Sequence, residues 1–221
     1  NTITNKEIAV PKKGGSSSIE GGELYPGQVY YNDFEREDDG TTIYGGGSFI
    51  EFGGNFGRVF QNIGGAKRTN YLVLPEDVLS HSKETKEMSI GVWVNAANAG
   101  ASSDYMWAPL FSAYASGPAS DNGTPMFICQ YRGILQVNCN GWCDFTDAQN
   151  LAGTNGVYHD ATDWLADKDW HYYTVTLTET NAKVYFDGVL KNEWKVSGSG
   201  DGNVIGGLFS NGSDLKYICL G

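Results

Sequence analysis

Two strand-like runs in the C-terminal third of the chain constrain its fold more than any other feature. Residues 170–177 (WHYYTVTL) and 183–186 (KVYF) are rich in aromatic and β-branched side chains, which favour strands. Asp187-Gly188 then precedes another apolar pair, Val189-Leu190. An Asp-Gly pair supplies the positive φ angles of a type I′ turn, so these runs predict antiparallel strands joined by tight turns.

The rest of the chain also has the pattern of an all-β protein. Its 30 Gly separate short strand-like runs, and one run places Ile90, Val92 and Val94 on one face and Trp93 on the other. Only residues 75–87 could form a helical turn. Because helices and strands do not alternate, a nucleotide-binding α/β fold is excluded and two packed antiparallel sheets are expected. The predicted strands cover residues 28–34, 41–44, 48–52, 58–62, 71–74, 88–95, 109–115, 125–131, 134–139, 170–177, 183–186, 204–209 and 215–220.

The first part of the chain differs in composition from the rest. Residues 11–22 (PKKGGSSSIEGG) are rich in Gly and Ser and contain little that could pack. We therefore expect residues 1–27 to form a flexible tether and residues 28–221 to form a single domain. A tether of this kind suits a secreted or lipid-anchored surface protein. No run of about 18 apolar residues is present, so no transmembrane helix is expected.

The net charge of the chain restricts its partners. The chain carries 26 Asp and Glu against 15 Lys and Arg, a formal net charge of −11. Such a surface repels nucleic acid and anionic lipid head groups. It tolerates neutral glycans, basic partners and divalent cations, and it also aids solubility whatever the function is.

Several short motifs follow one another in a recognisable order. They are residues 31–35 (YNDFE), 89–94 (SIGVWV), 110–112 (LFS), Trp170-His171 with 185–188 (YFDG), and 205–207 (IGG). In this order, over residues 30–221, they resemble laminin-G-like, concanavalin-type jelly rolls. The resemblance implies a two-sheet antiparallel sandwich in a family that mostly binds sugars or proteins. It also implies an extracellular or cell-surface location, on the bacterial outer surface or in the periplasm.

The end of the chain departs from this family pattern. Similar domains continue beyond the strand at residues 205–207 to an acidic strand that pairs near the first strand, whereas this chain stops at Leu220-Gly221. Without that strand, an edge near the N-terminal strand would be unpaired. We therefore expect either a shortened chain or a sheet that closes differently.

One run of carboxylates could support catalysis. Asp33, Glu35 and Glu37 alternate along a predicted strand, as the acid and nucleophile of retaining glycosidases do. However, Arg36 stands where an apolar core residue is expected, and an Asp-Asp-Gly turn follows at once. The pattern favours a solvated acidic turn, so catalysis is the less favoured interpretation and an enzyme is not excluded.

Cysteine and histidine chemistry is limited. Cys139 and Cys143 could form a local disulfide, and their spacing suits zinc poorly. Cys129 and Cys219 lie in apolar runs and are expected to be buried thiols. His171 opens a predicted strand, where a structural role is expected.

Calcium is the metal that the sequence supports best. It prefers oxygen ligands from Asp, Asn and backbone carbonyls, and jelly rolls similar to this one often hold a structural calcium ion. The candidate ligands are Asn32, Asp33, Asp201, Asn203 and Asp214. No other cofactor is expected.

Aromatic residues in polar loops are the candidates for sugar contacts. Sugar binding combines aromatic faces with Asn, Asp or Gln side chains. Trp93 and Trp170 lie on predicted strands and are expected to pack. We therefore expect a carbohydrate-binding module without catalysis; a glycoside hydrolase and a protein-binding adhesion module are the alternatives. The candidate residues are Tyr105, Trp107, Trp142, Tyr158 and Trp164.

Overall fold

The computed structural model describes a part of the chain that is built almost entirely of strands. It describes residues 30, 32–35, 40–62, 70–76, 78–79, 81–95, 108–114, 127–131, 134–139, 158–160, 169–179, 181–195 and 217–221. The expected tether at residues 1–27 and the predicted strand at residues 204–209 lie outside these ranges. No helix within them is long and apolar enough to cross a membrane.

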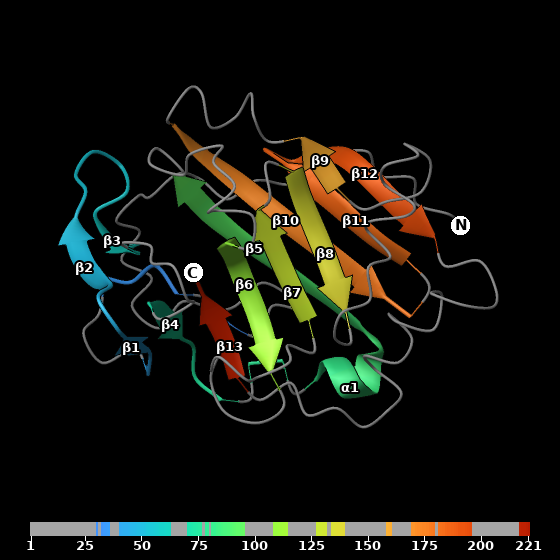
Figure 1. Ribbon diagram of the computed structural model, residues 1–221, viewed down its shortest axis with the longest axis horizontal. Helices are drawn as coiled ribbons and strands as arrows, with labels where there is room; N and C mark the ends of the chain where they lie inside the picture. The colour runs from blue at the N-terminus through green and yellow to red at the C-terminus, as the bar shows by residue number, and fades with distance from the viewer. Residues whose placement is uncertain are drawn as a thin grey trace.

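Two antiparallel sheets form a sandwich, with the larger sheet lying over the smaller one in Figure 1. The smaller sheet has the order β12-β11-β10-β5, and a separate hairpin pairs β2 with β3. The larger sheet has the order β1-β4-β13-β6-β7-β8-β9. This architecture confirms the predicted all-β, two-sheet jelly roll. The strands are β1 (Thr42–Tyr44), β2 (Ser48–Glu51), β3 (Arg58–Gln61), β4 (Tyr71–Val73), β5 (Glu87–Asn95), β6 (Ala108–Tyr114), β7 (Phe127–Tyr131), β8 (Ile134–Cys139), β9 (Tyr158–Asp160), β10 (Trp170–Thr178), β11 (Asn181–Phe186), β12 (Val189–Lys195) and β13 (Tyr217–Leu220).

The hairpins at β10, β11 and β12 form as the sequence predicts. Asp187 and Gly188 have φ angles of 48° and 81°, both positive, as a type I′ turn requires. Phe186 pairs with Val189 across this turn. The single described helix, α1 (Ser82–Thr85), falls within the predicted helical turn.

The core lies against one face of β10. Tyr173, Val175 and Leu177 alternate along this strand and are at most 1% exposed. Val92, Ile90 and Met88 of β5 stand directly opposite them, because a strand places every second side chain on one face. Trp93 lies on the other face, opposite Tyr172, so the predicted alternation of β5 is confirmed.

The predicted strand at residues 28–34 is wrong at its described end, residues 32–34. Phe34 has a positive φ of 63°, outside the β region that regular strand residues occupy. The Asn32 Oδ1 atom accepts a 2.7 Å hydrogen bond from the Phe34 amide, and Asp33 Oδ1 accepts a 3.2 Å bond from the Glu35 amide. Short Asn and Asp side chains can replace a strand ladder with such local bonds, and here they form a turn.

The last strand, β13, is an interior strand of the larger sheet. Cys219 of β13 pairs with Val73 of β4 on one side and with Ser112 of β6 on the other. The larger sheet is thus continuous through its C-terminal strand, with β1 at its outer end. Strand β9 was not predicted, because a run of three residues is too short to show a period.

Candidate functional site

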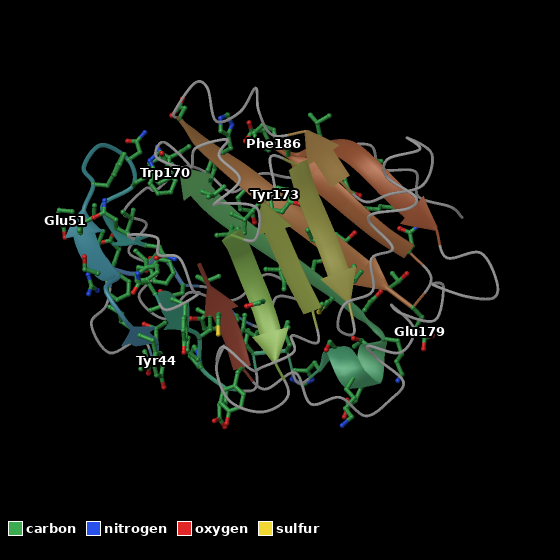
Figure 2. The ribbon with its side chains drawn as sticks, viewed as in Figure 1. Tyr44, Glu51, Trp170, Tyr173, Glu179 and Phe186 are labelled. Carbon is green, nitrogen blue, oxygen red and sulfur yellow. The ribbon has the colours of Figure 1, made fainter. Side chains whose placement is uncertain are left out.

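A cluster of aromatic rings lies where the β2–β3 hairpin meets the start of β10. The Phe56 ring stacks on the Trp170 indole, with centroids 4.2 Å apart and planes at 19°. The Phe52 ring meets the same indole edge-on at 5.2 Å. We call Phe52, Phe56 and Trp170 the aromatic platform. Trp170 marks this end of β10 in Figure 2, whereas Glu179, which directly follows β10, marks the opposite end of that strand.

Glycines in the loop between β2 and β3 present the two phenylalanines. Gly53, Gly54 and Gly57 have φ angles of 84°, 61° and 55°, a left-handed region that other residues rarely adopt. The Phe52 amide donates a 2.8 Å hydrogen bond to the Gly57 carbonyl, which closes the loop. The loop therefore folds back sharply and brings both rings to one side.

Aromatic side chains of the smaller sheet pack against the platform. Trp170 and Tyr172 are two residues apart on β10, so their side chains share a face. Trp93 of β5 completes this support. Its ring contacts Phe56 at 5.6 Å and Tyr172 at 5.3 Å. Trp93 and Trp170 thus pack against other rings, as their strand positions predict.

The platform combines an exposed ring with exposed polar side chains. Phe52 is 49% exposed, although its ring is held against two other aromatic rings. Asn55 in the loop and Asp169 before β10 are both exposed. Asp169 also accepts a 2.7 Å hydrogen bond from the Trp170 amide through Oδ1. An apolar surface flanked by an amide and a carboxylate can contact both the faces and the hydroxyl groups of a sugar.

A second set of contacts ties the hairpin to residues 34 and 35. The Arg58 guanidinium donates a 2.9 Å hydrogen bond to the Phe34 carbonyl and lies 4.1 Å from the Phe49 ring centroid. The Arg58 amide donates a 3.0 Å bond to Glu35 Oε1. These contacts hold the base of the β2–β3 hairpin. They also give Glu35 Oε1 a structural role as a hydrogen-bond acceptor.

The alternation that suggested a catalytic pair is absent from the described residues. Asp33 and Glu35 lie in the turn around Phe34, not along a strand face, and both are exposed. Their side chains make the turn and hairpin bonds described above. Glu37 lies outside the described residues.

The predicted calcium ligands are only partly described. Asn32 and Asp33 each use Oδ1 to cap a neighbouring backbone amide. Within the described ranges, no group of three or more His, Cys, Asp and Glu side chains could hold a metal ion. Asp201, Asn203 and Asp214 lie outside those ranges, so calcium stays a prediction.

The predicted sugar-contacting residues fall mostly outside the described ranges. Tyr158 is the first residue of β9 and pairs with Gln136. Sequence reasoning missed Phe52 and Phe56. The signal was present in residues 52–57 (FGGNFG), where two aromatic side chains stand within a glycine turn. The other four candidates, Tyr105, Trp107, Trp142 and Trp164, are not among the described residues.

His171 and Cys219 have the environments that the sequence predicts. The His171 Nδ1 atom lies 2.8 Å from Asp187 Oδ2, and its ring stacks on Phe186 at 4.5 Å. Cys219 is a fully buried thiol beside Tyr71 and Val73. Cys129 and Cys139 lie on β7 and β8, and the predicted disulfide partner Cys143 lies outside the described residues.

Comparisons with known proteins give distant likenesses to solved structures, of which two are described here. No protein-family model matches the chain, and no curated protein matches it. The chain is similar to the structure of domain 4 of AbnA, a GH43 extracellular arabinanase from Geobacillus stearothermophilus, in complex with arabinotriose. Their identity is 13%, with 82% of this chain and 72% of that chain covered and a TM-score of 0.40.

The second likeness is to SCLam, a non-specific endo-β-1,3(4)-glucanase from family GH16. The identity is 11%, 69% of this chain and 51% of that chain are covered, and the TM-score is 0.31. Both TM-scores lie below 0.5 and both identities below 25%, so neither likeness assigns a function to this chain.

Proposed function

We propose that this chain is a carbohydrate-binding module without catalysis, and that the aromatic platform contacts the sugar. The observation that carries the proposal is the Phe52 ring, which is 49% exposed yet braced by Phe56 and Trp170. An aromatic ring held rigidly at the surface binds an apolar sugar face with little loss of side-chain freedom.

The polar surroundings favour a neutral glycan as the ligand. Asn55 offers both donors and an acceptor to hydroxyl groups, and Asp169 offers acceptors. A net charge of −11 repels polysaccharides that carry uronate or sulfate groups. The laminin-G-like resemblance adds an extracellular or cell-surface location and a structural calcium ion to the proposal.

The first test is binding to a panel of neutral soluble and insoluble polysaccharides, in calcium and in EDTA. We expect binding without release of reducing sugar. Weaker binding in EDTA would support the calcium ion. Release of reducing sugar would overturn the non-enzyme proposal, and failure to bind any neutral glycan would overturn the carbohydrate proposal.

Phe52→Ala tests the platform itself. Removing the exposed ring is expected to weaken glycan binding about fivefold to tenfold, because an aromatic contact contributes about 1 kcal/mol. The free energy of unfolding should change little, since Phe52 is already 49% exposed. Isothermal titration calorimetry measures the affinity and differential scanning calorimetry the stability.

The matched control for Phe52→Ala is Ile43→Ala. Ile43 is 37% exposed and lies on β1 of the larger sheet, whereas Trp170 lies in the smaller sheet. We expect this variant to bind glycan as the unmodified chain does. Unchanged affinity in Phe52→Ala would show that the platform is not the contact surface.

A protein-binding module is the second candidate, and β1 is the observation that favours it. Ile43 and Tyr44 are 37% and 40% exposed on this strand, which ends the larger sheet within the described residues. An exposed strand edge can accept a strand from a partner. If the glycan panel is negative, loss of partner binding in Ile43→Lys would support this candidate.

A further inference from the structure

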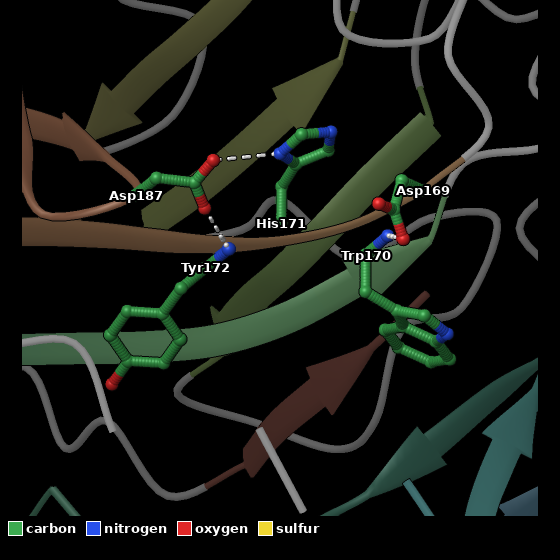
Figure 3. Close-up of polar contacts among 5 residues, drawn as sticks. All are labelled: Asp169, Trp170, His171, Tyr172 and Asp187. Atoms are coloured by element: carbon green, nitrogen blue, oxygen red, sulfur yellow. Dashed lines mark hydrogen bonds and ion pairs between the residues drawn. The ribbon is translucent and has the colours of Figure 1, made fainter. Parts of the chain in front are cut away.

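Three contacts link the β11–β12 turn to the start of β10. The Asp187 amide donates a 2.8 Å hydrogen bond to the Tyr172 carbonyl, and Asp187 Oδ1 accepts a 2.9 Å bond from the Tyr172 amide. Asp187 Oδ2 lies 2.8 Å from His171 Nδ1. Figure 3 shows both carboxylate contacts, one to each of the two residues that follow Trp170.

The carboxylate extends the ladder between β10 and β11 by one position. In an antiparallel pair, two opposite residues exchange both of their backbone hydrogen bonds. Here the Asp187 amide makes the first of these bonds, whereas its side chain, in place of its carbonyl, accepts the second. The turn begins at Asp187, where φ is 48°, and the carboxylate reaches back to Tyr172.

The turn by itself does not require a carboxylate. Glycine and asparagine both adopt a positive φ in this kind of turn at low cost. The carboxylate instead serves His171, whose ring is also fixed by its stack on Phe186 at 4.5 Å. The backbone of β10 is thereby held from the β11 side immediately after Trp170.

The opposite side of β10 is held by β5. Trp170 pairs with Asn95 and Tyr172 pairs with Trp93, so loss of the Asp187 contacts would not detach the strand. It would release one side of the residues that orient the Trp170 indole. That indole is the ring on which Phe56 stacks and against which Phe52 stands.

We infer that Asp187 is a positioning residue for Trp170, and that through Trp170 it holds the aromatic platform in its binding geometry. The expected effect of Asp187 on glycan affinity rests on the proposed function. The expected effect of Asp187 on the position of the Trp170 indole can be measured without a ligand. The two can therefore be tested separately.

The test uses the full chain labelled with 5-fluorotryptophan, with the Trp170 fluorine resonance assigned by its loss in Trp170→Phe. In Asp187→Gly the turn is kept and the carboxylate is removed, so we expect the Trp170 resonance to move or broaden without ligand. Affinity for a glycan from the panel should fall about tenfold if the binding orientation is populated a tenth of the time.

Two further variants make the result decisive. Asp187→Asn keeps an acceptor for the Tyr172 amide but presents an NH₂ group to His171, so a smaller shift of the same resonance is expected. This variant decides the outcome if Asp187→Gly does not fold. The control is Glu179→Ala, because Glu179 lies at the opposite end of β10 from Trp170. This variant should leave the Trp170 resonance in place.

The possible outcomes separate the inference from the proposed function. An unmoved Trp170 resonance in the folded Asp187 variants would overturn the inference, even if their melting temperatures fall. That pattern would describe a carboxylate that only stabilises the turn. A moved resonance in a chain that binds no glycan would uphold the positioning of Trp170 and reject the carbohydrate proposal.

Discussion

At the scale of single residues, a few of the described side chains are completely buried. Leu72, Ala113 and Tyr173 have no exposed surface, and they come from β4, β6 and β10. Interior packing is dense, so removing a buried side chain loses its contacts and leaves a cavity. Stability should therefore depend steeply on these positions and weakly on the exposed aromatic residues.

Leu72→Ala measures this dependence. We expect a loss of about 2–5 kcal/mol in the free energy of unfolding, because the substitution combines lost burial with a cavity. Chemical denaturation followed by circular dichroism measures the change. Val189→Ala, at a 44% exposed position, serves as its control and should cost much less. An equal loss in both variants would contradict the assigned core.

At the scale of elements, β13 has a larger role than its four residues suggest. It lies between β4 and β6 and pairs with both, so both of its edges are in the ladder. The Leu74 amide also donates a 2.8 Å hydrogen bond to the Ile218 carbonyl. An interior strand cannot be lost without exposing two new sheet edges.

Deleting residues 217–221 is expected to abolish cooperative folding. The deletion leaves β4 and β6 without a common neighbour and removes Ile218 and Cys219, which are at most 2% exposed. Thermal unfolding followed by near-ultraviolet circular dichroism should show no sharp transition. A shortened chain that melts like the full one would refute the interior position of β13.

At the scale of the whole molecule, the sandwich should be independent of the N-terminal tether predicted from residues 1–27. That stretch contains the Gly/Ser-rich segment at residues 11–22, whose composition offers little apolar surface for burial. The described strands begin at Thr42 and include both sheets of the sandwich. Fold and glycan binding should therefore reside in residues 28–221.

Removing residues 1–27 tests this division of the chain. We expect the melting temperature and the glycan affinity to match those of the full chain, because every core position that the structure describes lies outside residues 1–27. Differential scanning calorimetry and glycan titration, side by side on both chains, measure this. A clearly lower melting temperature would show that these residues pack on the domain.

Local chemistry explains what the sequence could predict. The Asp187-Gly188 turn, the alternation of β5 and the short helical turn each depend on neighbouring residues, and all three are present in the structure. The predicted strand at residues 28–34 is wrong at residues 32–34 for a local reason as well. The run at residues 28–34 resembles a strand, but Asn32 and Asp33 bond their own backbone neighbours instead.

The sequence by itself determined the all-β class, most strand positions and the turns, because these depend on side-chain period and on turn residues. Only the tertiary structure decided that β13 lies between β4 and β6 and that Phe52 and Phe56 meet Trp170. Strand order and ring contacts join segments far apart in the chain. Strand order and ring contacts depend on how the two sheets bury their apolar faces against each other, which cannot be inferred from a local sequence pattern.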